Sequence, residues 1–236
     1  QIVELMTKCL SHRGPDDSGF FQNENISLGH NRLSIIDLQN SKQPMKDEKN
    51  KNIIIFNGEI YNFKELSIEL QNKFNVNFRN NTDTIVFLEL ISKFGLMKAL
   101  EKVEGMFAFG LWDKKKRCLT LARDRVGEKP LYYGWQGKGA NKVFLFGSEL
   151  KALKPHPGFE GQINRNAIAL QLRHNYIPDP YSIYKDIYKL LPGHYLQLKE
   201  NDLKKGMLTK IVNYWSLIKC AINGNKNQLS LNALEI

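Results

Sequence analysis

The 236-residue sequence predicts an α+β fold in which two β-sheets stack face to face and helices cover their outer sides. Apolar residues recur at helical spacing in several segments, which indicates amphipathic helices. Other segments are short and rich in β-branched and aromatic residues, and several are apolar on both faces, which indicates strands that are covered on both sides. The expected strands of this second kind are 53–56, 107–112, 118–122, 131–135 and 143–146.

The N-terminal part is expected to begin with the end of an amphipathic helix. Its apolar residues recur at helical spacing over 1–10, and the Gly- and Pro-containing segment 11–19 then predicts a loop. Strands are expected around 26–29 and 33–37, before Pro44 marks a connection.

Three helices are expected between the strand 53–56 and the strand 107–112. Apolar spacing places the first over 63–73. Thr82 is a good N-cap for the second helix, and Gly95 is a good terminator for it. The third is a short helix over 96–103.

The C-terminal part alternates between helical and irregular patterns. A helix is expected over 164–173, after which several prolines make 178–193 irregular. The charged segment 199–210 is expected to be an exposed hairpin or loop, and the polar segment 223–227 a linker.

The net charge of +10 invites a nucleic-acid interpretation. The lysines are scattered, however, and their densest run, 114–117, lies where a hairpin turn is expected. No aromatic residues interleave with basic ones as a base-stacking surface requires. The pattern therefore favours a solvated basic surface, with no nucleic-acid or membrane partner expected.

The three cysteines have no metal-ligand spacing, and the five histidines form no zinc motif, so no metal site is expected. Three unpaired cysteines fit a reducing cytosol. No apolar run is long enough to cross a bilayer, and the first residues do not resemble a signal peptide. We therefore expect a cytoplasmic location.

The most informative segment is Asn57-Gly58-Glu59-Ile60-Tyr61-Asn62, which directly follows the predicted strand 53–56. Glycine leaves its N–H open to close approach, asparagine supplies an amide donor, and glutamate can hold a cation. Two donors at a strand end suit a developing oxyanion, and the acid beside them suits an ammonium group. The segment therefore fits a site for an amino-acid amide, and a polar turn is the alternative that it leaves open by itself.

Other polar motifs accompany this segment in a specific order along the chain. They are Ser11-His12-Arg13-Gly14-Pro15-Asp16-Asp17, His30-Asn31-Arg32-Leu33-Ser34-Ile35-Ile36-Asp37, Thr82-Asp83-Thr84, Gly105-Met106-Phe107-Ala108-Phe109, Ala122-Arg123-Asp124-Arg125-Val126-Gly127-Glu128-Lys129-Pro130-Leu131-Tyr132-Tyr133 and Gly147-Ser148-Glu149-Leu150-Lys151-Ala152-Leu153. Together with 57–62, the ordered set closely resembles the amino-terminal glutaminase domain of glutamine-hydrolysing asparagine synthetases. The segments 176–188 and 191–195 resemble the connection to the synthetase domain of bacterial members.

The resemblance implies a class II amidotransferase with the four-layer αββα sandwich of N-terminal-nucleophile hydrolases. It implies a glutaminase domain over 1–200 and, over 201–236, a connector toward an ATP-dependent synthetase domain. In this family the thiolate of a first-residue cysteine attacks glutamine, and its α-amine, with a pKa of about 8, serves as the base. The ammonia released then amidates aspartate that ATP has activated.

Motif by motif, the resemblance assigns Arg32 to the glutamine α-carboxylate, because its planar fork allows bidentate pairing. It assigns Asn57 and Gly58 to the oxyanion hole, and Glu59 and Asp83 to the α-ammonium. A surface ion pair for Arg32 and simple helix-dipole complementation for Asp83 are the alternatives. The expected glutamine-binding set is Arg32, Leu33, Ser34, Ile35, Ile36, Asn57, Gly58, Glu59 and Asp83.

The sequence departs from the family pattern at its beginning. Gln1 stands first, nothing before His12 matches the family's Cys-Gly opening, and Cys9 lies inside a predicted helix. We therefore expect a chain without the nucleophile and without the opening strand, which leaves apolar sheet edge exposed. The 236 residues also contain no Ser-Gly-Gly-x-Asp-Ser pyrophosphate loop. ATP and Mg are accordingly expected only in a synthetase domain, and no cofactor is expected in this segment.

The expected partners are glutamine and a synthetase domain in cis, and a homodimer stays open. Two other functions also stay open. One is a non-catalytic module that binds glutamine or another protein. The other is a relative that amidates a cell-surface sugar or a different acid.

Overall fold

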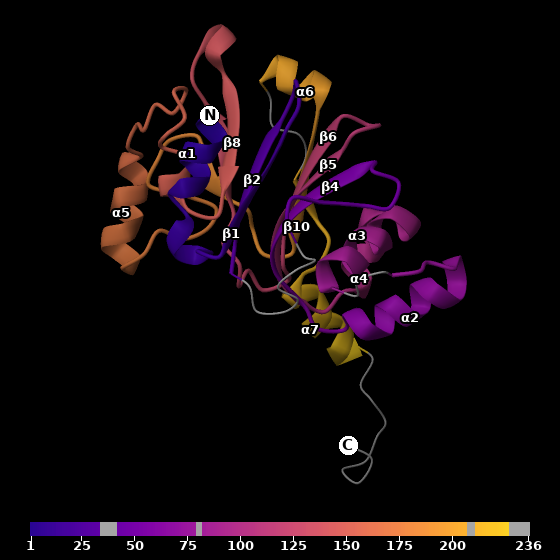
Figure 1. Ribbon diagram of the computed structural model, residues 1–236. Coiled ribbons are helices and arrows are strands. Elements are labelled where there is room, and N and C mark those ends of the chain that lie inside the picture. Colours follow the sequence, from indigo (N-terminus) through magenta and orange to yellow (C-terminus); the bar gives the residue numbers. More distant parts are fainter. Residues whose placement is uncertain (34–41, 79–81, 207–210, 227–236) are drawn as a thin grey trace.

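The computed structural model describes residues 1–33, 42–78, 82–206 and 211–226. Figure 1 shows an αββα arrangement in which two β layers pack between two helical layers. The layer of helices α2 (Phe63–Phe74), α3 (Asp83–Phe94) and α4 (Leu96–Lys102) covers one side. The helices α1 (Ile2–Lys8) and α5 (Arg165–His174) lie on the opposite side. This confirms the four-layer sandwich.

The larger sheet has six antiparallel strands in the order β11-β10-β6-β5-β4-β3. β4 and β5 are its longest strands, and they pair along their whole length. The strands are β3 (Met45–Lys46), β4 (Asn52–Ile60), β5 (Gly105–Asp113), β6 (Cys118–Arg123), β10 (His194–Lys199) and β11 (Ile211–Asn213).

One face of this sheet packs against α2 (Phe63–Phe74), α3 (Asp83–Phe94) and α4 (Leu96–Lys102). Alternate residues of β4 and β5 supply the sheet side of this core, including the stacked rings of Phe56 and Phe107. Phe87 of α3 contacts both rings, so the helical layer is tied to the centre of the sheet.

The other face packs against a second β layer of two small sheets. One pairs β1 (Asp17–Gln22) with β2 (Ser27–Arg32), and the other has the order β8-β7-β9. The strands of the latter are β7 (Tyr132–Gln136), β8 (Val143–Gly147) and β9 (Ile187–Lys189). The core between the two β layers includes Leu28, Trp112 and Tyr133.

Most of the elements expected between 53 and 174 are confirmed, including the cap that Thr82 provides for α3. Four expectations were wrong. β1 occupies part of the expected loop 11–19, because β2 supplies a full antiparallel partner for its polar sequence. β9 lies within the expected irregular stretch 178–193, because β7 pairs with it.

The other two corrections concern helices. α6 (Glu200–Lys205) replaces the expected hairpin, because Glu200 and Asp202 place negative charge in its first turn. α7 (Leu217–Lys226) runs through the expected linker, and the hydroxyl of Ser216 accepts from the Lys219 N–H as its N-terminal cap. The strand expected over 33–37 falls largely outside the described residues.

Candidate functional site

The predicted donors Asn57 and Gly58 lie near the end of β4, where they pair with Ala108 and Phe107 of β5. Both backbone polar groups of Phe107 bond to Asp124: its N–H donates to Oδ2 over 3.3 Å, and its C=O accepts from the Asp124 N–H over 2.7 Å. Because an antiparallel residue points both groups to one side, Phe107 faces β6. The opposing Gly58 therefore points its N–H and C=O away from β5, toward the open edge of β4.

Partners occupy this open edge on both sides of Gly58. The Phe56 N–H donates to Gln43 Oε1 over 2.6 Å, and the Phe56 C=O lies 3.1 Å from both Gln43 Nε2 and His30 Nε2. The Ile60 N–H donates to Asp83 Oδ2 over 3.0 Å. Within the described parts of the chain, no hydrogen bond is found to the Gly58 N–H between them. The Gly58 N–H therefore points toward the same edge of β4 that His30 and Asp83 contact.

Gly58 is also required sterically at this position. A Cβ there would lie 2.0 Å from the Met106 carbonyl oxygen and 2.6 Å from the Phe107 Cα, and the Gly58 φ of +158° is one that side chains rarely adopt. Only glycine allows β4 and β5 to approach this closely at the donor.

Asn57 points its side chain to the opposite face of β4 from Phe56, into a cavity between the two β layers. Its Nδ2 is buried and has no hydrogen-bond partner among the described residues. Buried amide nitrogens are rarely left without an acceptor, because the loss of solvation costs about 1–3 kcal/mol. The Asn57 amide in this cavity therefore lowers the stability of the fold, because no hydrogen bond offsets its burial. Such donors are typical of binding sites, where a ligand supplies the acceptor.

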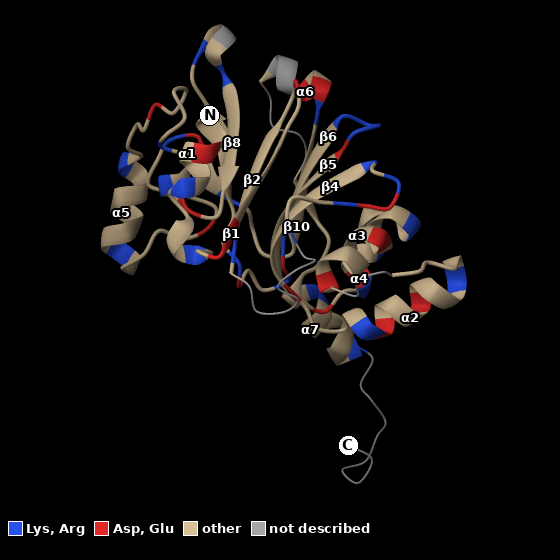
Figure 2. Ribbon diagram, in the orientation of Figure 1, with Lys and Arg blue, Asp and Glu red and all other residues tan. Residues whose placement is uncertain are grey.

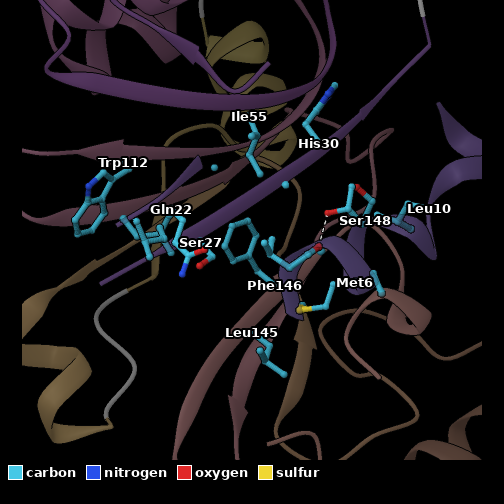
Figure 3. Close-up of a pocket in the computed structure, with 18 of the residues that line it drawn as sticks. Met6, Leu10, Gln22, Ser27, His30, Ile55, Trp112, Leu145, Phe146 and Ser148 are labelled. Atoms are coloured by element: carbon cyan, nitrogen blue, oxygen red, sulfur yellow. Dashed lines mark hydrogen bonds between the residues drawn. The ribbon is translucent and has the colours of Figure 1, made fainter. Parts of the chain in front are cut away.

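The cavity has a volume of about 760 Å³. Figure 3 shows side chains from β2, β4, β5, β8 and α1 around it, with Phe146 and Leu145 of β8 across from Ser27 and His30 of β2. Among the described residues, β2 pairs only with β1 and β8 only with β7, so both strands present an unpaired edge to the cavity.

His30 lines this cavity and reaches β4 through its bond to the Phe56 carbonyl. Burial lowers its pKa to about 4, against the opposing effect of that bond, and the positive charge of Arg32 lowers it further. The imidazole is therefore neutral at neutral pH, and it stands on the same face of β2 as Arg32 two residues later.

Arg32 is buried at the end of β2. Its carbonyl accepts from the Asp16 N–H over 3.1 Å, and Gly14 packs directly on its backbone. Leu33 is described and is exposed. Ser34, Ile35 and Ile36, which were also predicted to line the pocket, lie outside the described residues.

Asp83 is the first residue of α3 and is joined to the end of β4. Besides the bond from the Ile60 N–H, its Oδ1 accepts from the Thr84 N–H over 2.6 Å and from the Thr84 hydroxyl over 3.2 Å. A carboxylate offers about four lone-pair positions, so this anchoring leaves room for a further donor.

Glu59 is exposed and lies next to Tyr61. The pKa of Tyr61 is raised by desolvation and then by the negative charges of Glu128 and Glu59. Acidic side chains therefore gather beyond the end of β4, on the side where an ammonium group was predicted to bind.

The structure brings Asn57, Gly58 and Asp83 together through β4. It adds His30 and Gln43, which the sequence analysis did not select. Their role depends on contacts with Phe56 across 13 and 26 residues, which no local pattern reveals. The position of His30 two residues before Arg32, in the same motif, was the one available signal.

In the described ranges, no group of three or more His, Cys, Asp or Glu side chains is arranged to hold a metal ion. None of the helices described has the length and apolar character needed to cross a membrane. Figure 2 shows the basic residues distributed over α1, α2, α5 and the ends of several strands.

Comparison with known families and proteins gives consistent matches. The model of a glutamine amidotransferase domain matches residues 1–215. The chain is 38% identical to a provisionally named glutamine-hydrolyzing asparagine synthetase 2 of Methanocaldococcus jannaschii, over 91% of the chain. It is 34% identical, over 92% of the chain, to the glutamine-hydrolyzing asparagine synthetase 3 of Bacillus subtilis. It spans 43% and 34% of the lengths of these two relatives, so it corresponds to less than half of each.

Solved structures agree on the fold. The allosteric regulatory enzyme of purine biosynthesis superposes with a TM-score of 0.56 at 20% identity, covering 81% of this chain and 35% of that one. The glutamine phosphoribosylpyrophosphate amidotransferase of B. subtilis superposes with a TM-score of 0.53 at 19% identity, covering the same shares.

Proposed function

The chain belongs to the glutamine amidotransferase family, and we propose that it binds L-glutamine at the end of β4, where Asn57 and Gly58 act as the oxyanion donors. Glutamine hydrolysis to glutamate and ammonia is the reaction that this site serves. The observation that carries the proposal is the pair of donors without partners among the described residues, the buried Asn57 Nδ2 and the outward Gly58 N–H. Preorganised donors of this kind stabilise the charge that develops on an amide oxygen.

The remaining roles follow from charge and position. Arg32 pairs with the glutamine α-carboxylate, and Asp83 with Glu59 holds the α-ammonium. Leu33, which directly follows Arg32, is assigned to the same pocket. Asp83 already binds the β4 backbone, so it also sets the distance between the ammonium end of glutamine and the oxyanion donors.

In the whole protein, we propose, the ammonia serves the ATP-dependent amidation of aspartate in a synthetase domain on the same polypeptide. Residues 1–200 form the glutaminase domain, and 201–236 lead toward that synthetase domain, which would bind ATP and Mg. The relatives named as asparagine synthetases support this choice over amidation of a sugar or another acid. A cytoplasmic location and a homodimer belong to the same proposal.

The test is calorimetric titration of the 236-residue chain with L-glutamine. The wild-type chain is expected to bind, and Arg32→Ala is expected to weaken binding about 10- to 100-fold, because a charge-assisted pair contributes about 1.5–3 kcal/mol. Lys116→Ala, which removes an exposed cation from a distant turn, is the control and should bind like wild type. Absence of glutamine heat in the wild type would reject the site.

A non-catalytic glutamine-binding role for this 236-residue segment is the second candidate. Cys9 ends α1, Cys118 is buried in β6 with its pKa raised by burial, and Cys220 is exposed in α7. None of these sulfurs lines the cavity beside Asn57. A chain that binds glutamine without releasing glutamate would support this role, whereas glutamate release would reject it.

A further inference from the structure

Glu149 joins two segments that are far apart in the sequence. It follows β8 and precedes the short helix η3 (Leu150–Ala152). Its Oε1 lies 3.0 Å from both His12 Nε2 and Arg13 Nη1, and its Oε2 lies 3.3 Å from Lys151 Nζ. One carboxylate therefore anchors the loop 11–16 to the end of β8, across 136 residues of sequence.

The same loop is fixed to β2 on its other side. A Cβ on Gly14 would lie 2.6 Å from backbone carbons of both Arg32 and Asn31, so this part of the loop rests directly on the β2 backbone. The Asp16 N–H donates to the Arg32 carbonyl over 3.1 Å. Since β2 and β8 share no ladder in the described structure, the loop spans the gap between their ends.

We propose that Glu149 is a positioning residue for glutamine binding: by holding the loop 11–16 at the end of β8, it fixes the Arg32 backbone, and with it the guanidinium that pairs with the α-carboxylate. This inference rests on the proposed glutamine site. Glu149 itself touches no substrate.

The electrostatics of the cluster agree with this role. Burial alone would raise the pKa of Glu149, but hydrogen bonds from Arg13, His12 and Lys151 lower it to about 2. Glu149 is therefore charged at any working pH. Replacing it by glutamine leaves the cations of Arg13 and Lys151 close together without their shared anion, so the loop is expected to detach from β8.

A matched control is available on the other side of the molecule. Glu69 in α2 also accepts from two cations, Lys73 over 2.7 Å and Lys102 over 2.9 Å, and its exposure of 21% is close to the 26% of Glu149. Glu69→Gln removes an equivalent ion network in the helical layer, away from Arg32. Any general effect of losing such a network appears in both variants.

The experiment is calorimetric titration with L-glutamine on the 236-residue chain, with urea unfolding of each variant to confirm folding. Glu149→Gln is expected to raise the glutamine Kd about tenfold, which corresponds to about 1.4 kcal/mol, and Glu69→Gln to leave it within about twofold of wild type. Equal Kd values for wild type and Glu149→Gln would overturn the inference.

A double-mutant cycle with Arg32→Lys tests whether Glu149 affects glutamine binding through Arg32. If Glu149 acts through Arg32, adding Glu149→Gln to Arg32→Lys raises Kd by less than about threefold, because coupled residues are not additive. Full additivity would overturn the inference while leaving the glutamine site standing. A wild-type chain that does not bind glutamine would overturn the proposed function, and this inference with it.

Discussion

The two faces of the six-stranded sheet use the same strands for different purposes. Toward the helices, Phe56, Phe107 and Phe109 pack their rings around Phe87 with centroids 5.2–5.8 Å from it. Toward the second β layer, the alternate residues Asn57 and Ala108 border a cavity of about 760 Å³. The face toward the helices, here called the closed face, is filled by apolar contacts. The face toward the second β layer, here called the open face, keeps a cavity and a polar donor without a partner among the described residues.

This difference follows from the period of two in a strand. Each residue that turns an aromatic ring into the helical core leaves its neighbour facing the cavity. The closed face can therefore hold β4 in place, while the open face carries the Asn57 amide, whose burial lowers the stability of the fold. The packed core and the proposed glutamine donor therefore lie on opposite sides of one strand.

The largest expected effect is a loss of stability on the closed face. Phe87→Ala removes a fully buried ring with three aromatic neighbours and is expected to lower the free energy of unfolding by about 3–5 kcal/mol. Phe146→Ala, whose half-buried ring borders the cavity, is the matched change on the open face and should cost under about 2 kcal/mol. Urea unfolding measures both, and equal losses would remove the contrast between the faces.

The second effect is the pH dependence that His30 gives to the open face. Its folded pKa of about 4 is below the ordinary 6.5, so the unfolded chain binds more protons between these values, and stability is lost as pH falls from 6.5 toward 4. The loss is on the order of 1–3 kcal/mol, reduced because the ring borders the cavity and water can reach it.

His30→Gln is the variant that isolates this dependence. A glutamine amide can still donate to the Phe56 carbonyl but does not titrate. Urea midpoints at pH 7 and pH 4.5 should therefore differ less in His30→Gln than in wild type, while acid effects of other groups such as Glu149 stay common to both. Identical pH dependence in the two chains would exclude His30 as the source.

The third effect is a gain in stability at Asn57, the proposed oxyanion donor. Asn57→Leu replaces a buried amide without a partner by an apolar side chain of similar size and is expected to stabilise the fold by about 1–2 kcal/mol. The same variant is expected to bind L-glutamine more weakly, because it loses one of the two proposed oxyanion donors.

Asn62 provides the opposite case for the same substitution. Its Nδ2 donates to the Lys102 carbonyl over 3.0 Å, and its Oδ1 accepts from the Glu104 N–H over 3.0 Å. Asn62→Leu is therefore expected to destabilise by about 1–3 kcal/mol in the same urea assay. A loss of stability in both variants would mean that the burial of the Asn57 amide costs no more free energy than that of an amide with hydrogen-bond partners.

The closed face was the more predictable from sequence. The spacing of apolar residues in 63–103 and 107–122 is strong enough to place α2–α4, β5 and β6. β1 was missed because its sequence, Asp17-Ser18-Gly19-Phe20-Phe21-Gln22, has no apolar alternation and depends on pairing with β2. α7 was missed because Gly224 and three neighbouring polar residues resemble a linker.

From the residues alone, the candidate site was predictable only where its members adjoin in sequence, and Arg32 and Asp83 were assigned through the family resemblance. Asn57 and Gly58 follow from their place after an apolar strand. The ties from His30 to Phe56, from Asp83 to Ile60 and from Glu149 to Arg13 join residues 23 to 136 positions apart. No periodicity encodes such contacts, because they are set by how the layers assemble.

The smallest expected effect compares added volume on the two faces. Ala108 borders the cavity, whereas Ala122, on the neighbouring strand β6, is fully buried in the helical core. Ala108→Val places two methyl groups toward open space and should change the free energy of unfolding by less than about 0.5 kcal/mol. Ala122→Val overpacks a closed core and should cost about 1–3 kcal/mol. Because both substitutions are identical and both sites lie in paired strands, β-propensity cancels, and only the difference in packing between the faces separates the two urea midpoints. A costly Ala108→Val would mean that the open face is packed as tightly as the closed one.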